Sequence, residues 1–117
     1  PEQVGYVNGH GTATKNGDVA ESQATFGAFK GRAVPISSLK TYIGHSLGAC
    51  GGIEAWLSIM MMNRKWFAPN LNLKNVDPAC APLDYIVGEG REIDTEYVMS
   101  NNFAFGGITT SLIFKRV

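Results

Sequence analysis

The stretch that most constrains the fold is a histidine held between glycines at the mouth of a long apolar run. Residues 40–52 read Lys-Thr-Tyr-Ile-Gly-His-Ser-Leu-Gly-Ala-Cys-Gly-Gly, and the apolar run follows over residues 53–62. As a helix this run would be apolar on nearly every face, so it has to be buried. A titratable group at the start of a buried helix is costly, and such costs are usually associated with function. His45 is therefore the first candidate functional residue.

The composition argues against several classes of protein. The 117 residues correspond to one domain or to one half of a larger one, and 44% of them are apolar, as in an ordinary globular core. Ten basic and ten acidic residues cancel, which gives no electrostatic reason to expect binding to nucleic acid or to a membrane surface. The two cysteines, Cys50 and Cys80, have no CxxC spacing and are predicted to be reduced thiols, which favours a cytoplasmic protein.

No membrane-spanning helix and no signal peptide are predicted. The longest apolar run is too short to span a bilayer and contains Glu54 and Ser58. The chain opens on Pro1 rather than methionine and passes almost at once into a predicted strand. We therefore expect the sequence to be a section of a longer protein.

The sequence predicts alternating strands and helices, followed by strands that look antiparallel. The predicted order is strand, helix, strand, helix and three strands, at residues 4–7, 18–29, 33–37, 53–65, 83–87, 97–100 and 110–115. Residues 66–82 are rich in Asn, Pro and Asp and are predicted to form a long surface connection. This pattern predicts an α/β fold, a mixed β-sheet with a buried central helix. Such a helix normally has sheets on both sides, so a second covering layer is expected outside this chain.

Three glycine-rich loops carry the candidate site. They occupy residues 7–14 around His10, residues 40–49 around His45 and residues 100–107 around Phe105. Each loop follows or precedes a predicted strand, so the three could cluster at one edge of a shared sheet. In this order and spacing, they resemble the three C-terminal signatures of the elongating β-ketoacyl-acyl-carrier-protein synthases, types I and II.

The resemblance covers essentially the whole chain and implies the C-terminal half of a thiolase-fold condensing enzyme. Residues 1–117 would form the C-terminal β-ketoacyl synthase domain, with the N-terminal half absent. That family joins a thioester-bound acyl chain to malonyl-acyl carrier protein with loss of carbon dioxide, in fatty-acid or polyketide biosynthesis. Its nucleophilic cysteine lies in the N-terminal half, so the chain alone is expected to be inactive.

The resemblance also implies partners and cofactors. The expected partners are acyl carrier protein, the N-terminal half of the same enzyme and a second copy of the full-length protein in a homodimer. Neither a metal nor a resident cofactor is implied, because the substrates are carried on the phosphopantetheine of acyl carrier protein. The sequence does not indicate acyl-chain length or the surface on which the carrier docks.

The resemblance assigns roles to four polar residues of the loops and the helix. His10 and His45 match the two active-site histidines, whose N–H groups would stabilise the enolate left by decarboxylation. One of them could also move a proton or activate a water, and the sequence does not divide these tasks. Lys40 and Glu54 match a lysine and a glutamate near the active site. An isolated charge inside an apolar helix is expensive, so we predict a buried Lys40–Glu54 pair, with capping or pairing of Glu54 elsewhere as the alternative.

Further matches lie in the first and third loops. Thr12 and Thr14 match threonines whose hydroxyls bind the pantetheine arm, and ordinary loop hydrogen bonding is the alternative. Phe105 matches a gating phenylalanine whose backbone N–H also helps to form the oxyanion hole. Gly106 and Gly107 follow it and would absorb the backbone rotation at low steric cost. The alternative for Phe105 is a core residue of the loop.

The chain departs from the family pattern at several positions. Ala104 replaces a common glycine before Phe105, and residues 108–109 read Ile-Thr where Thr-Asn is usual. Both changes affect the gate and its loop rather than the histidines. Lys15 replaces a frequent proline and Cys50 a frequent alanine, and we interpret Cys50 as a small buried packing residue.

Other functions fit the sequence less well than that of a condensing enzyme. The main alternative is a non-catalytic, chain-length-factor-like partner subunit of a condensing heterodimer, which would keep the fold and shape an acyl tunnel. Retention of both histidines argues against it, and the presence of a cysteine upstream would decide. A chalcone-type or thiolase-type condensing enzyme has different C-terminal patterns, and a freestanding interaction domain leaves the histidine loops unexplained.

Overall fold

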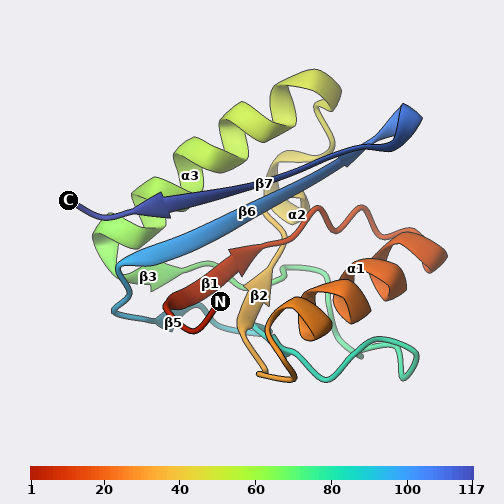
Figure 1. Ribbon diagram of the computed structural model, residues 1–117, viewed down its shortest axis with the longest axis horizontal. Helices are drawn as coiled ribbons and strands as arrows, with labels where there is room; N and C mark the ends of the chain where they lie inside the picture. The colour runs from red at the N-terminus through yellow and green to blue at the C-terminus, as the bar shows by residue number, and fades with distance from the viewer.

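The computed structural model describes residues 1–117. Its main element is a five-stranded sheet with the strand order β4-β2-β1-β6-β7 (Figure 1). Its strands are β1 (Val4–Asn8), β2 (Pro35–Ser37), β4 (Asp84–Tyr85), β6 (Tyr97–Ala104) and β7 (Ile108–Lys115). All of them pair in parallel except β7, which returns from β6 through a tight turn and pairs with it antiparallel. The mixed sheet predicted from the sequence is therefore confirmed.

The two long helices lie on opposite faces of this sheet (Figure 1). They are α1 (Lys15–Ala28) and α3 (Cys50–Arg64), and the connections contain α2 (Lys40–Ile43) and the 3₁₀ turns η1 (Leu47–Ala49) and η2 (Phe105–Gly107). A second, two-stranded sheet pairs β3 (Trp66–Phe67) with β5 (Arg91–Glu92). None of the helices is long and apolar enough to cross a membrane.

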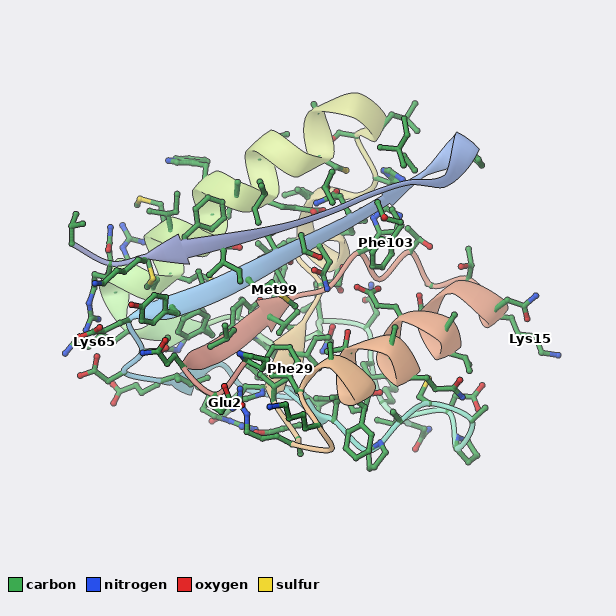
Figure 2. All side chains as sticks on the ribbon, in the orientation of Figure 1. Glu2, Lys15, Phe29, Lys65, Met99 and Phe103 are labelled. Atoms are coloured by element: carbon green, nitrogen blue, oxygen red, sulfur yellow. The ribbon has the colours of Figure 1, made fainter.

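Two hydrophobic clusters, one on each face of the sheet, hold the layers together. The alternation of side chains along β1 explains the division, since Tyr6 packs with Met62 on the α3 face and Val7 packs with Phe29 on the α1 face. Val4 shares the face of Val7 because the register between β1 and β6 shifts between Val4 and Tyr6, as at a bulge. The side chains in Figure 2 fill the space between the sheet and both helices.

One side of α3 is not covered within this chain. Glu54, Ser58 and Met62 are buried, whereas Trp56 of the same helix is 62% exposed. Ile113 of the edge strand β7 is 60% exposed as well. The sequence predicts such exposed apolar surface for a helix that shares its second covering layer with another part of the protein.

The helices begin earlier than the sequence predicts. α1 begins at Lys15 rather than at residue 18, because the Asp18 N–H already donates to the Thr14 carbonyl at 3.1 Å. α3 begins at Cys50 rather than at residue 53, so its first turn contains two glycines that the sequence pattern places in the loop. Helix ends are the least certain part of a sequence-based prediction, and neither shift changes the order of the elements.

Three other predictions were wrong. The strands β4 and β6 look antiparallel in the sequence but pair in parallel with β2 and β1, because each is reached by a connection long enough to cross back over the sheet. Residues 66–82 are not wholly a surface connection, since Phe67 of β3 is fully buried. Residues 101–104 extend β6 instead of forming a loop, because they pair with residues 108–111 of β7.

Candidate active site

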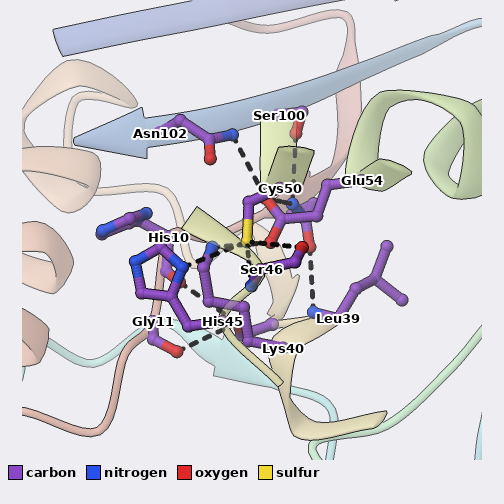
Figure 3. A network of polar contacts seen from close by, with 12 residues as sticks. His10, Gly11, Leu39, Lys40, His45, Ser46, Cys50, Glu54, Ser100 and Asn102 are labelled. Atoms are coloured by element: carbon purple, nitrogen blue, oxygen red, sulfur yellow. Dashed lines mark hydrogen bonds and ion pairs between the residues drawn. The ribbon is translucent and has the colours of Figure 1, made fainter. Parts of the chain in front are cut away.

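The candidate site lies at the carboxyl edge of the parallel strands. β1 leads directly to His10, β2 leads to α2 and His45, and β6 carries Phe103 near its end. The imidazole rings of His10 and His45 are perpendicular with centroids 5.5 Å apart, and the ring of Phe103 lies 5.5 Å from that of His10. The expected clustering of the loops at one edge is therefore confirmed, and Figure 3 shows the two histidines together.

A buried carboxylate holds the His10 loop. The backbone N–H groups of His10 and Gly11 donate to the two carboxylate oxygens of Glu21, at 2.7 and 2.9 Å. Gly11 has a φ of 41°, and a Cβ there would lie 2.6 Å from the side chain of Ser38, so the turn requires glycine. Burial raises the pKa of Glu21, and the two backbone hydrogen bonds oppose that shift. Glu21 was not predicted as a site residue, because one acidic residue on a predicted surface helix gives no sign that it faces inward.

The His10 imidazole is favoured in its neutral form. Desolvation lowers its pKa, and the nearby charges of Lys40 and His45 lower it further. Its Nδ1 atom is buried and has no hydrogen-bond partner within the chain. A neutral imidazole has one nitrogen that donates and one that accepts, so His10 can offer either to a ligand.

The contacts of His45 determine its tautomer. The backbone N–H of Leu47 donates to Nδ1 at 3.1 Å, so Nδ1 is an acceptor and the proton of the neutral ring lies on Nε2. The thiol of Cys50 also lies 3.1 Å from Nδ1. Cys50 is 1% exposed, as predicted for a packing residue, but the sequence did not predict its contact with the imidazole. The arrangement leaves the Nε2–H of His45 available to a substrate.

A buried ion pair lies beside the histidines, as the sequence predicts. Lys40 Nζ lies 2.6 Å from Glu54 Oε1, and Glu54 is completely buried. The second carboxylate oxygen accepts a hydrogen bond from the side-chain amide of Asn102 at 3.1 Å (Figure 3). It accepts another from the side-chain amide of Asn8 at 3.3 Å. Residues from α2, α3, β1 and β6 therefore meet at Glu54, whose charge is both paired and hydrogen-bonded. Neither Asn8 nor Asn102 was predicted as a site residue.

A cavity of about 640 Å³ opens beside the histidine loops. Its lining includes Thr12, Thr14, Lys40 and His45, together with residues of α1 and of the connection before β4. The hydroxyls of Thr12 and Thr14 lie 3.2 Å apart. A volume of this size is ordinary for a ligand site. The contact of the two threonines with a pantetheine arm stays a prediction.

Phe105 lies at the turn between β6 and β7. Gly106 and Gly107 after it have φ values of 78° and 77°, a conformation that residues with a Cβ adopt only with strain. The Phe105 side chain is 97% exposed within this chain. It therefore does not pack as a core residue of the loop. Its gating movement and its part in an oxyanion hole stay predictions.

Parallel strands bring two histidine loops and a buried lysine–glutamate pair to one edge of the sheet, and this fold is that of the C-terminal part of a thiolase-like ketosynthase structure. Residues 1–74 match the family described as "Beta-ketoacyl synthase, C-terminal domain". The chain belongs to the β-ketoacyl synthase family, as its C-terminal domain.

Several known proteins are similar over nearly the whole chain. The 3-oxoacyl-[acyl-carrier-protein] synthase 2 of Synechocystis sp. is 42% identical, with 99% of this chain and 28% of the relative aligned. A crystal structure of a beta-ketoacyl synthase from Burkholderia phymatum shares 70% identity with a TM-score of 0.96, over 99% of this chain and 28% of that one. A type II polyketide ketosynthase in complex with its acyl-carrier protein shares 29% identity with a TM-score of 0.93, over 100% of this chain and 29% of that one. The chain therefore spans less than a third of each relative's length.

Proposed function

We propose that the protein to which this chain belongs catalyses the decarboxylative Claisen condensation of an acyl thioester with malonyl-acyl carrier protein, in fatty-acid or related biosynthesis. The observation that carries the proposal is the pair of imidazoles of His10 and His45, with centroids 5.5 Å apart and the proton of His45 on Nε2. The names of the relatives, 3-oxoacyl-[acyl-carrier-protein] synthase and beta-ketoacyl synthase, support the same reaction.

The two histidines suit the decarboxylation step. Loss of carbon dioxide from the malonyl group leaves an enolate, whose negative charge lies largely on the thioester oxygen. Two N–H donors placed about 2.9 Å from that oxygen stabilise the charge as it develops. Perpendicular rings 5.5 Å apart can each direct one N–H to an oxygen between them. His45 donates through Nε2–H, and neutral His10 can either donate or accept the proton of a water.

The Lys40–Glu54 pair supports this chemistry from the same site. Lys40 is the first residue of α2, the helical turn that leads directly to His45, and its ammonium lies 2.6 Å from Glu54. The pair therefore braces the His45 loop against α3. Burial, and then the charge of Lys40, lower the pKa of His10, which favours the neutral imidazole. Donors that are held in place before the reaction need no reorganisation when the charge develops.

The nucleophile of the proposed reaction belongs to another part of the protein. Cys50 is unsuitable, because it is 1% exposed and a thioester substrate cannot reach its sulfur. The enolate carbon would attack the acyl thioester on that external cysteine, whose thiolate leaves as the new carbon–carbon bond forms. The backbone N–H of Phe105 would contribute to the oxyanion hole for this step. None of these steps needs a resident metal or cofactor.

Partners are proposed on the same basis. Acyl carrier protein is the proposed substrate carrier, supported by the related ketosynthase that is bound to its acyl-carrier protein. The cavity lined by Thr12 and Thr14 would receive the phosphopantetheine arm. The exposed apolar side of α3, which includes Trp56, would pack against the N-terminal half of the same enzyme. The full-length protein is proposed to form a homodimer.

Condensation by the intact purified protein tests the proposal. With acyl- and malonyl-carrier protein as substrates, we expect release of carbon dioxide and a β-ketoacyl product two carbons longer. The His45→Ala protein is the matched control and should release carbon dioxide about 10²–10³-fold more slowly. No product and no acylated cysteine, from a folded protein that binds both carriers, would contradict the proposal and favour the non-catalytic partner subunit.

A further inference from the structure

A thiol that the proposed reaction does not use lies against the imidazole of His45. Cys50 Sγ is 3.1 Å from His45 Nδ1, 3.1 Å from the backbone nitrogen of Ser46 and 3.4 Å from the Ser46 hydroxyl oxygen. Figure 3 shows these contacts around the sulfur. Cys50 is the first residue of α3 and is 1% exposed, so the thiol is fixed inside the site.

The donors and acceptors in this cluster can be assigned from the backbone. The N–H of Ser46 can only donate, so the sulfur accepts that hydrogen bond. The N–H of Leu47 donates to His45 Nδ1, so Nδ1 carries no proton and cannot donate to the sulfur. The only proton that can lie between Cys50 Sγ and His45 Nδ1 is therefore that of the thiol. The Ser46 hydroxyl can donate to the sulfur, which leaves the thiol proton for Nδ1. The single lone pair of Nδ1 is then shared by the backbone N–H of Leu47 and the S–H of Cys50.

We infer that Cys50 is a positioning residue for His45: its S–H donates to Nδ1 and holds the ring so that Nε2–H faces the substrate. The inference rests on the function proposed above. The other donor, the N–H of Leu47, belongs to the turn η1, where the Leu47 side chain is 71% exposed. Cys50 instead ties the imidazole to α3, the helix that also carries Glu54. Alanine at position 50 would leave the Leu47 donor alone.

The sulfur could hold the ring through its proton or through its volume, and a matched set of substitutions separates the two. Cys50→Ser keeps a donor in a smaller side chain. Cys50→Val fills the space of the sulfur with two methyl groups and has no donor, and Cys50→Ala removes both the donor and the filling group. If the proton is responsible, the serine protein resembles the wild type and the valine protein resembles the alanine protein. If the volume is responsible, the order is reversed.

The experiment uses the intact enzyme with ¹⁵N-labelled histidine and malonyl-carrier protein as substrate. Side-chain ¹⁵N chemical shifts of His45 report whether Nδ1 still receives the second donor, independently of activity. In Cys50→Val and Cys50→Ala we expect a changed Nδ1 shift and a kcat for decarboxylation reduced about two- to threefold at unchanged KM, since the hydrogen bond of a weak thiol donor is lost. Cys50→Ser should recover most of the wild-type Nδ1 shift and most of the wild-type kcat. Acylation of the nucleophile should be unchanged in all three variants.

A Cys50→Val enzyme with the wild-type Nδ1 shift and the wild-type kcat would overturn the inference, as would a serine protein that behaves like the valine protein. If the valine protein does not fold, the alanine and serine proteins decide by the same two measurements. His45→Ala separates this inference from the proposed function. Full decarboxylation without His45 would remove the proposed function, whereas an inactive His45→Ala protein beside unaffected Cys50 variants would remove only the inference.

Discussion

Lys40 Nζ and Glu54 Oε1 lie 2.6 Å apart where solvent is almost excluded, with the two side chains 4% and 0% exposed. The residues come from different helices, α2 and α3, and Glu54 also accepts hydrogen bonds from Asn8 of β1 and Asn102 of β6. One carboxylate therefore joins the turn that leads to His45 to two neighbouring strands of the sheet. Its removal should affect stability as well as catalysis.

Glu54→Gln should destabilise the intact protein by about 3–5 kcal/mol, because it leaves the Lys40 ammonium buried without a counter-charge. Denaturant unfolding of Glu54→Gln, Lys40→Met and the double variant measures the effect. The double variant should lose less than the sum of the singles, by about 1–3 kcal/mol. Additive losses would show that the two residues are not coupled.

The exposed pair of Lys65 and Asp94 provides the matched control for this experiment. Its atoms are 2.7 Å apart, nearly the same as in the buried pair, but its side chains are 53% and 61% exposed. Lys65→Met should cost no more than about 1 kcal/mol, because water screens and solvates both charges. A loss as large as that of Lys40→Met would show that burial does not set the strength of the Lys40–Glu54 pair.

Glu21→Gln should loosen the His10 loop. The carboxylate accepts from two backbone N–H groups, those of His10 and Gly11, whereas an amide has only one oxygen to offer. We expect a loss of about 1–3 kcal/mol in unfolding free energy, the usual cost of a buried donor without a partner. Glu92→Gln, which removes the same charge from an exposed position on β5, is the control and should be nearly neutral. Equal losses in both would contradict the role of Glu21.

Decarboxylation should depend on pH through His10. Burial, and then the charges of Lys40 and His45, lower the pKa of its imidazole below the ordinary value of 6.5. The ring therefore stays neutral to lower pH than an ordinary histidine, and the acid limb of kcat/KM for decarboxylation should lie below pH 6.5. Lys40→Met removes one of the causes and should move the limb upwards. A wild-type limb above pH 6.5 would contradict this assignment.

The same shift has a consequence for stability. Between the lowered pKa of folded His10 and the ordinary value of 6.5, the unfolded chain binds more protons than the folded one. The contribution of His10 to stability is therefore present above that window and decreases as the pH falls through it. As the pH falls, the His10→Ala protein should lose less unfolding free energy than the wild type. Denaturant unfolding of both proteins at several pH values measures the difference.

The sequence was sufficient for features with strong local signals. Ion pairing of Glu54 could be predicted because an acidic residue in an apolar helix needs a partner and Lys40 was the nearest cation of the motifs. The histidine loops could be predicted to cluster at one edge of the sheet, because each glycine-rich segment lies beside a predicted strand. The end of α1 before Gly31 was also predictable, since a φ of 81° there suits glycine.

Other features depend on pairing between distant segments and left no local signal. Asn8 and Asn102 both face Glu54 because β1 and β6, which are far apart in the sequence, pair in parallel. Glu21 faces the His10 loop because of how α1 packs on the sheet. The paired segments of β3 and β5 are two residues long, too short for any alternation to be recognised.

Phe105 should control access to the acyl pocket of the intact enzyme. We expect its ring to block the pocket when the nucleophile is free and to move when the nucleophile is acylated, with Gly106 and Gly107 absorbing the rotation. Phe105→Ala should change the order of acyl and malonyl entry while the backbone donor remains. Ala104→Gly, which restores the common glycine, should widen the range of accepted chain lengths. Crystal structures of the free and acylated enzyme with the Phe105 loop unmoved would contradict the gate.

The most direct measurement compares two partial reactions in the intact enzyme with His10 or His45 replaced by alanine. Loss of one N–H donor at the enolate oxygen should reduce malonyl decarboxylation by about 10²–10³-fold in each variant. Acylation of the nucleophile, measured separately with acyl-carrier protein, should fall much less, because the enolate forms only in the later step. Decarboxylation near the wild-type rate in either variant, with the protein folded, would contradict the assignment of His10 and His45 to this reaction.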